Sequence, residues 1–220
     1  SDCRGNESMD FKLTEEQSAL VEAVQAILSD HSDLAVADRH GFCHFDHKLQ
    51  HVLLENGFLD AGRDLGALEA ALVTIEAARI PAAVEVGASA IVASQVLGEE
   101  RIEGPVALVA TGGLDKPIRN LPVARTALVE SGDDVIVVRV EAKDVETTPS
   151  IYAYPFGRFR APPDLTRGRS IAGAAAKLRQ WWRVALAAEC CAAAQSAIAF
   201  TIEQVINRQV LGRPVGAAPR

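Results

Sequence analysis

The residues best placed to do chemistry lie near the end of the chain, in the segment RQVLGRP that begins at Arg208. Arg208 and Arg213 fall at or just past the end of a predicted helix. There the helix dipole favours a cation, and the side chains are free to reach an anionic ligand or a neighbouring subunit. Gly212 is a residue type that ends helices, and Pro214 prevents continuation. The spacing therefore indicates a helix end suited to contacting an anion.

A group of histidines and a cysteine invites a metal hypothesis. His40, Cys43, His44, His47 and His51 lie close in sequence, and the last two are four residues apart, on one face of a predicted helix. A metal site needs a second pair of ligands, and the sequence offers none elsewhere. A polar helix face explains the same residues, so we predict no metal site.

One long helix must position the C-terminal arginines. The stretch 183–216 is expected to be helical until it ends at Gly212. Apolar residues recur every three to four positions and predict one buried face: Leu186, Cys190, Ala193, Ala194, Ile198, Ile202, Val205 and Ile206. Alanines crowd the first half, so another helix could pack very close.

This small-residue helix followed by Arg-x-x-apolar-Gly-Arg-Pro-apolar-Gly resembles the first helix of the C-terminal domain of acyl-CoA dehydrogenases. The resemblance implies that Arg208, Val210, Leu211 and Gly212 touch FAD bound mainly to a neighbouring subunit. The family usually has a polar residue where Val210 stands and phenylalanine where Leu211 stands. The arginine is kept, but a hydrogen-bonding side chain and an aromatic ring are absent. A core helix of an unrelated all-α bundle is the alternative.

Composition narrows the class of protein. The chain has 220 residues, 49% hydrophobic but only 5% aromatic, a mixture that suits close-packed helices. The net charge is −7 and no basic stripe is present, so we expect no nucleic-acid partner. The longest apolar run, 184–200, is largely alanine and cysteine and is interrupted by Glu189. We therefore judge it too weakly hydrophobic for a membrane span.

The cysteines and the N-terminus bear on localisation. The four cysteines have no disulfide-framework spacing, and no signal peptide is visible, so a reducing, cytoplasmic setting is expected. Residues 1–8 precede Met9 and are interpreted as a leader outside the fold.

Residues 9–103 predict an N-terminal helical domain. Thr14 and Gln17 form a capping box before the first helix, and helices are expected at 45–56, 65–79 and 81–97. The opening Phe-x-Leu-Thr-Glu-Glu-Gln also resembles the start of acyl-CoA dehydrogenases.

Residues 104–165 predict a small β domain. Strands are expected at 106–110, 125–130, 134–140, 145–150 and 151–154. Thr111 and the two glycines after it either cradle a ring or phosphate with backbone N–H groups or form a plain turn. Residues 166–220 then begin a C-terminal helical domain. The predicted class is α+β, acyl-CoA dehydrogenase-like, with a reduced middle domain.

The resemblance also implies a reaction. In the family a carboxylate removes the α-proton of an acyl-CoA while FAD takes the β-hydride, which requires a dry pocket. One family position for the glutamate falls here at Trp182, which cannot act as a base, and the other lies beyond Arg220. Glu189 and Glu203 fall at neither position and are interpreted as ordinary helix residues. The catalytic residue is therefore unknown.

Three hypotheses of function remain. The first is a subunit of an FAD-dependent acyl-CoA dehydrogenase, with an acyl-CoA substrate and a homologous partner subunit in a heterotetramer. Because the short β domain resembles that of reduced subunits in steroid-CoA dehydrogenases, the acyl group is expected to be steroid-derived. The second is a non-catalytic partner that stabilises a catalytic chain. The third is an unrelated helical binding module.

Overall fold

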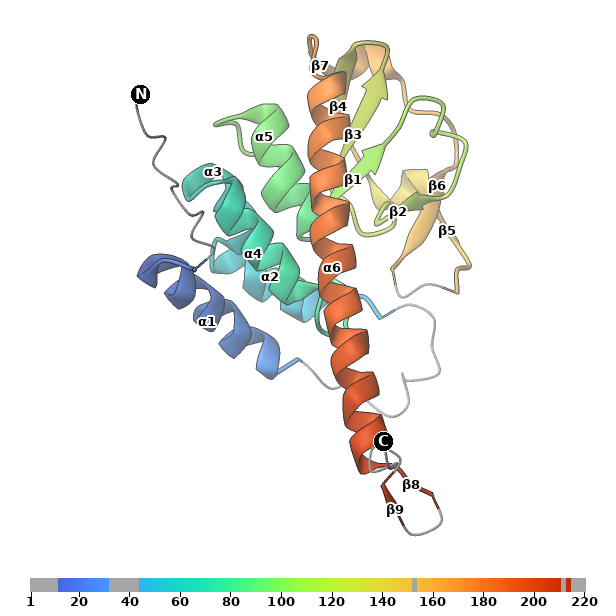
Figure 1. The fold of residues 1–220 in the computed structure, drawn as a ribbon. Coiled ribbons are helices and arrows are strands. Elements are labelled where there is room, and N and C mark those ends of the chain that lie inside the picture. Colours follow the sequence, from blue (N-terminus) through green and yellow to red (C-terminus); the bar gives the residue numbers. More distant parts are fainter. Residues whose placement is uncertain (1–11, 32–43, 152–153, 211–212, 215–220) are drawn as a thin grey trace, which may run out of the picture.

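The main body of the molecule consists of a helical layer and two small sheets. One long helix runs along the helical layer and along the sheets (Figure 1). The computed structural model describes residues 12–31, 44–151, 154–210 and 213–214. The helical layer contains α1 (Glu15–Ser29), α2 (His47–Glu55), η1 (Phe58–Asp60), α3 (Ala61–Asp64), α4 (Ala67–Ala77), the π-helix η2 (Gly87–Ala93) and α5 (Ser94–Leu97).

The start of α1 confirms the predicted capping box. The Gln17 N–H donates to Thr14 Oγ1 at 3.2 Å, and the Thr14 N–H donates to Gln17 Oε1 at 3.1 Å. These two bonds pair backbone donors that the first turn of a helix otherwise leaves free. Val24 and Leu28 on the inner face of α1 are buried.

The predicted helix over 81–97 is wrong in its first part, because helical structure begins only at Gly87. The backbone of Glu85 is bound by a side chain instead: Gln50 Nε2 donates to Glu85 O at 2.8 Å, and the Glu85 N–H donates to Gln50 Oε1 at 2.6 Å. The Ala83 N–H donates to His44 O at 2.8 Å. These long-range hydrogen bonds pair backbone groups of Ala83 and Glu85, so this segment does not need helical hydrogen bonds.

The β part consists of two sheets with different topologies. A four-stranded sheet has the order β1 (Val106–Val109), β3 (Thr126–Ser131), β4 (Asp134–Arg139), β7 (Arg169–Ile171), with β1 parallel to β3 and the other pairs antiparallel. A three-stranded antiparallel sheet has the order β2 (Ile118–Arg119), β6 (Phe156–Phe159), β5 (Val145–Thr148). Two 3₁₀ turns, η3 (Ala142–Asp144) and η4 (Leu165–Arg167), join the strands.

Three strands differ from expectation. The strand predicted at 151–154 is absent at Ile151 and Tyr154, and β6 begins at Phe156 instead. The short strands β2 and β7 were not predicted. β7 pairs with β4 and forms one edge of the four-stranded sheet.

The long helix α6 (Ala175–Asn207) does not end at Gly212 as predicted. It ends five residues earlier, where Arg208 adopts an extended backbone (φ −72°, ψ 121°) and its N–H bonds to Gln204 O. The chain then pairs with itself in a two-stranded hairpin, β8 (Gln209–Val210) and β9 (Arg213–Pro214). The hairpin hydrogen bonds replace the last helical turn that the sequence pattern suggested.

The face of α6 that packs on the body is also different from the predicted one. Its buried residues are small, apart from one leucine: Ala175, Leu178, Ala185, Ala188 and Ala192. Every residue of the predicted apolar face is exposed; Ile198, for example, is 59% exposed and Ile202 55%. Alanine permits close approach to α4 and η2, whereas the larger side chains of the predicted face stay exposed on this chain.

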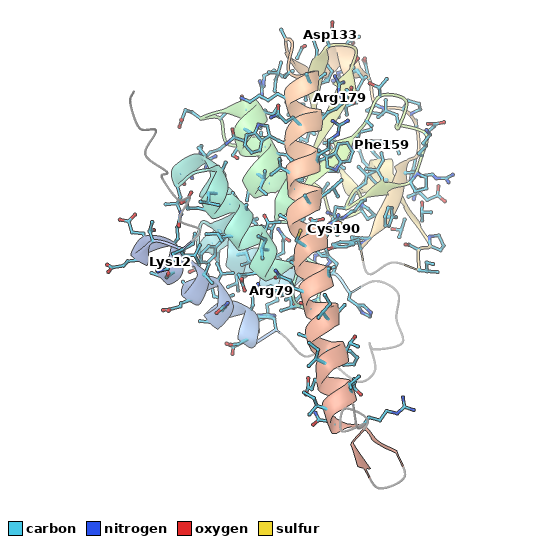
Figure 2. The ribbon with its side chains drawn as sticks, viewed as in Figure 1. Lys12, Arg79, Asp133, Phe159, Arg179 and Cys190 are labelled. Atoms are coloured by element: carbon cyan, nitrogen blue, oxygen red, sulfur yellow. The ribbon has the colours of Figure 1, made fainter. Side chains whose placement is uncertain are left out.

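Polar contacts fix α6 against both layers (Figure 2). Arg179 forms an ion pair with Glu130 of β3, at the sheet end of the helix. Arg79, at the end of α4, donates to Gln195 Oε1 at 2.9 Å, and Ser196 Oγ donates to Arg79 O at 3.1 Å. Beyond this crossing the helix extends past the body (Figure 1).

By length and composition α6 could cross a membrane, with a mean hydropathy of 1.5 over its most apolar 18-residue window. The judgement that it is too weakly hydrophobic is therefore not supported. It is the one such helix among the described residues; a mostly buried core helix of a soluble protein meets the same criterion, and 11% of this window is buried.

Candidate functional site

A cavity of about 270 Å³ lies where the helical layer, the sheets and α6 meet. We call it the interdomain pocket. Its apolar walls include Leu108 of β1, Phe156 of β6 and Trp182 of α6. Four polar residues also line it: Glu85, Arg119, Asn120 and Glu189. An apolar cavity with a few converging polar groups is the usual form of a ligand site.

An ion pair joins two walls of the interdomain pocket. Arg119 Nη1 donates to Glu189 Oε2 at 2.7 Å, and Nη2 donates to Oε1 at 3.0 Å. The Tyr154 ring lies over the guanidinium, 3.6 Å from the Arg119 carbon Cζ to the ring centroid. Burial lowers the pKa of Arg119, but the bonds and charge of Glu189 outweigh it and the pKa is raised. Glu189 is therefore a pocket residue rather than an ordinary helix residue.

Glu85, which also lines the interdomain pocket, is a buried carboxyl group with 1% of its surface exposed. It accepts hydrogen bonds from the Ser89 N–H and the Val106 N–H, both at 2.9 Å, and from the Ser89 hydroxyl. Burial raises the pKa of Glu85, and these bonds only partly oppose it. Its bonds link the start of η2 to β1.

Two buried polar atoms at this pocket have no hydrogen-bond partner among the described residues: Arg119 Nε, a donor, and Asn120 Oδ1, an acceptor. Asn120 is 5% exposed and has a left-handed backbone with φ 64°. Unpaired buried groups cost free energy, and they are commonly explained by a missing water or ligand. A ligand that carries an acceptor beside a donor would satisfy both.

Of the residues that the resemblance singled out, Trp182 lies at this pocket and Arg208 does not. Trp182 is half-buried in the pocket wall. Arg208 follows Glu189 by 19 residues along α6, which is about 28 Å at the helical rise. Val210 is in β8, and Leu211 and Gly212 lie outside the described residues. Arg208 therefore cannot reach the interdomain pocket of its own chain.

The glycine turn after β1 has the geometry of a plain turn. The Gly113 N–H donates to Ala110 O at 2.9 Å, and Gly112 has φ 67°. The Thr111 N–H donates to Glu130 Oε2 at 3.3 Å, so a carboxylate of the protein already uses this group. These contacts favour the plain-turn interpretation of the segment over the phosphate-cradle interpretation.

His31 and His51 each contact a different carboxylate. His31 Nδ1 lies 2.8 Å from Asp46 Oδ2, and His51 Nε2 lies 3.2 Å from Glu55 Oε1. Within the described ranges, no three His, Cys, Asp or Glu side chains are grouped closely enough to hold a metal ion. His40 and Cys43 lie outside those ranges.

The sequence of this chain matches no protein-family model and no curated protein, but its structure resembles solved ones. A chain of the ChsE4-ChsE5 complex from Mycobacterium tuberculosis aligns with TM-score 0.69 and 20% identity, over 96% of this chain and 72% of that one. Butyryl-CoA dehydrogenase from Megasphaera elsdenii aligns with TM-score 0.68 and 16% identity, over 96% and 74%. PigA with FAD and proline aligns with TM-score 0.63 and 15% identity, over 94% and 73%.

These likenesses define the class of fold. The chain has the acyl-CoA dehydrogenase fold, with helical, β and helical parts in that order, as the resemblance implied. The predicted α+β class is confirmed.

The residues that sequence reasoning missed are Arg119, Asn120 and the pocket role of Glu189. The first two belong to or follow β2, whose two residues give no periodic signal. One usable sign was present: Glu189 interrupts an alanine-rich apolar run. A charge in such a run often marks a paired, buried group.

Proposed function

We propose that this chain is a subunit of an FAD-dependent acyl-CoA dehydrogenase, which removes hydrogen from the α and β carbons of an acyl-CoA thioester. The observation that carries the proposal is that the two ends of α6, on an acyl-CoA dehydrogenase fold, serve different places. The first half of α6 forms a wall of the interdomain pocket, and Arg208 lies about 28 Å further along. This separation supports a flavin site that is completed by the neighbouring subunit.

The residues of the pocket fit a flat ring with polar edges. Phe156 and Trp182 offer aromatic surface, and Arg119 Nε and Asn120 Oδ1 offer a free donor and a free acceptor. Arg208 would contact the pyrophosphate in a neighbour, with Val210, Leu211 and Gly212 beside it. FAD, when bound, supplies the acceptor for the β-hydride.

The chain itself contributes exclusion of water and fixed charge. Leu108, Phe156 and Trp182 make the wall apolar, which strengthens electrostatic interactions inside. The base at the α-carbon would come from the partner, because Trp182 stands at one family position for it and has no basic group. This chain would hold and orient the acyl group while the partner removes the proton.

A specific observation favours a second candidate, the non-catalytic partner. The ion pair of Arg119 and Glu189 joins two walls of the pocket, and both side chains occupy space there. If the pair stays closed, this chain binds no flavin and only stabilises a catalytic subunit.

The partner is proposed to be a homologous subunit in a cytoplasmic heterotetramer. The support is the exposed apolar end of α6 and the likeness to a chain of a two-protein complex. We further propose that the acyl group is steroid-derived, which rests on the small β domain.

The test is flavin content. The visible flavin absorbance of the purified chain is measured alone and with a homologous partner, and flavin is quantified per chain. We expect flavin only with the partner and less than one per chain, and Arg208→Ala should lower it without unfolding the protein. Arg183→Ala, an exposed cation on the same helix, is the matched control. Absence of flavin in both preparations would refute the enzyme proposal and favour the second candidate.

A further inference from the structure

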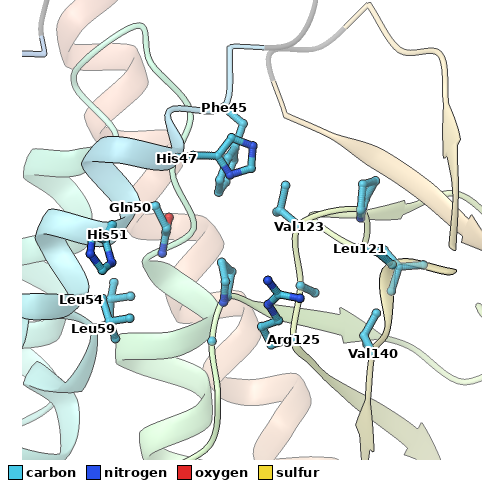
Figure 3. A pocket seen from close by; sticks show the side chains of 15 residues that line it. Phe45, His47, Gln50, His51, Leu54, Leu59, Leu121, Val123, Arg125 and Val140 are labelled. Atoms are coloured by element: carbon cyan, nitrogen blue, oxygen red, sulfur yellow. The ribbon is translucent and has the colours of Figure 1, made fainter. Parts of the chain in front are cut away.

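A second cavity, of about 350 Å³, lies between α2 and the β part and shares no lining residue with the interdomain pocket (Figure 3). We call it the α2 pocket. Its helical wall carries His47, His51 and Leu54, and its other wall carries Leu121, Val123 and Arg125. The volume is at the lower end of the range of about 300–1,000 Å³ found for small-molecule sites.

The walls of the α2 pocket are mostly apolar. Besides the leucines and Val123, Phe45, Pro105 and Val140 contribute hydrocarbon surface. Leu54 is 45% exposed, although a leucine gains free energy from burial. A ligand with an apolar body would cover this surface.

The charge in the α2 pocket has one sign. Arg125 lines it, and no lining residue is acidic. No ion pair or side-chain hydrogen bond of Arg125 is found among the described residues, in contrast to Arg119, Arg63 and Arg179, which all hold carboxylates. The imidazoles of His47 and His51 add N–H donors in either charge state, although His51 also contacts Glu55. A free guanidinium beside apolar walls is suited to an anion on an apolar body.

The α2 pocket is also connected to the interdomain pocket. Gln50 lines the α2 pocket, and its amide is bonded on both sides to the backbone of Glu85. The side chain of Glu85 lines the interdomain pocket. The two cavities therefore lie on either side of this one hydrogen-bonded pair.

We propose that the α2 pocket is a second binding site, for a small amphipathic anion whose carboxylate or phosphate is held by Arg125 and whose hydrocarbon part lies between α2 and the β part. The proposal rests on this pocket alone and holds whether or not the chain binds flavin.

Calorimetry of the full chain with three probes of equal chain length tests the proposal: decanoate, decyl phosphate and decanol. At least one anion should bind about 10-fold or more tightly than decanol, because decanol carries no charge with which to form a charge-assisted hydrogen bond to Arg125. The stronger anion identifies the head group. Equal binding of all three probes, or no binding of either anion, would overturn the proposal.

Two variants locate the site. Arg125→Met should weaken the favoured anion about 10-fold or more, whereas Arg139→Met should not. Arg139 is the matched control, because both arginines line a neighbouring surface groove but only Arg125 lines the α2 pocket. Ala142→Trp should block binding by filling the pocket while Arg125 stays in place. Loss of binding in Arg139→Met, or retention in Ala142→Trp, would contradict the assignment.

Discussion

The guanidinium of Arg119 and the carboxylate of Glu189 form a two-bond ion pair that joins the two-residue strand β2 to α6 across the interdomain pocket. Both side chains are partly buried, with 27% and 16% of their surfaces exposed. The pair therefore has consequences for stability as well as for the pocket.

Removing one partner of this pair should destabilise the fold. Arg119→Met leaves Glu189 unpaired, and we expect a loss of about 2–3 kcal/mol in the free energy of unfolding, below the value for a fully buried pair because water screens part of it. Adding Glu189→Leu should recover most of the loss. Urea unfolding measures each value. Arg101→Met is the control: it breaks exposed ion pairs with Asp60 and Asp64 and should change the free energy of unfolding by less than about 0.5 kcal/mol. A double variant no more stable than the single one would contradict this account.

Glu85 should make stability depend on pH in a definite direction. Its pKa in the folded state is raised above the ordinary 4.5. At a pH between these two pKa values, the folded state therefore holds a proton that the unfolded state has released. Its contribution is therefore fully present below about pH 4.5 and declines as pH rises through the raised pKa. Glu85→Ala leaves the Ser89 and Val106 N–H groups unpaired, at roughly 1–3 kcal/mol each.

Urea unfolding over a pH series measures this effect. The gap in stability between the native chain and Glu85→Ala should be largest at low pH and narrow as pH rises. Glu99→Ala, an exposed carboxylate, should show no such trend. A gap that widens with pH would show that Glu85 is ionised in the folded state.

The exposed end of α6 should control assembly. Ile198, Ile202 and Ile206 are each more than half exposed, and a charged residue there should disrupt a subunit interface. We expect Ile198→Glu with Ile202→Glu to lower the molar mass measured by light scattering, alone or with the partner, without lowering the helix content. Leu68→Glu, an equally exposed apolar residue on α4, should leave the mass unchanged. Equal masses for native and α6 variants would exclude this face as the interface.

A close approach between α3 and η2 depends on Gly62. A Cβ at this position would overlap Ala90 O and Ser94 Oγ, and the first of these is backbone that cannot move aside. Gly62→Ala should therefore cost about 1–3 kcal/mol of stability. Gly87→Ala should cost less, because its Cβ would meet the Glu189 carboxylate at 3.1 Å and Ala185 Cβ at 3.3 Å, and a shift of a few tenths of an ångström would relieve both contacts. Thermal unfolding compares the two, and the reverse order would contradict the packing described.

The sequence by itself determined the features that depend on neighbours along the chain. The capping box at Thr14 and Gln17, and the hairpin of β3 and β4 around Gly132, follow from local hydrogen bonds and turn conformation. The order of helical, β and helical parts could also be predicted, since the hydrophobic period changes at each boundary.

Only the tertiary structure decided which residues meet. Periodicity marked an apolar face on α6 but not which side packs inward; alanine allows close approach, so the alanine side is buried and the isoleucines are exposed. The start of η2 was set by Gln50, a side chain distant in sequence. Arg119 and Glu189 meet because β2 is held by β6 and α6 crosses it, and a pattern read along one segment carries no information about contacts of that range.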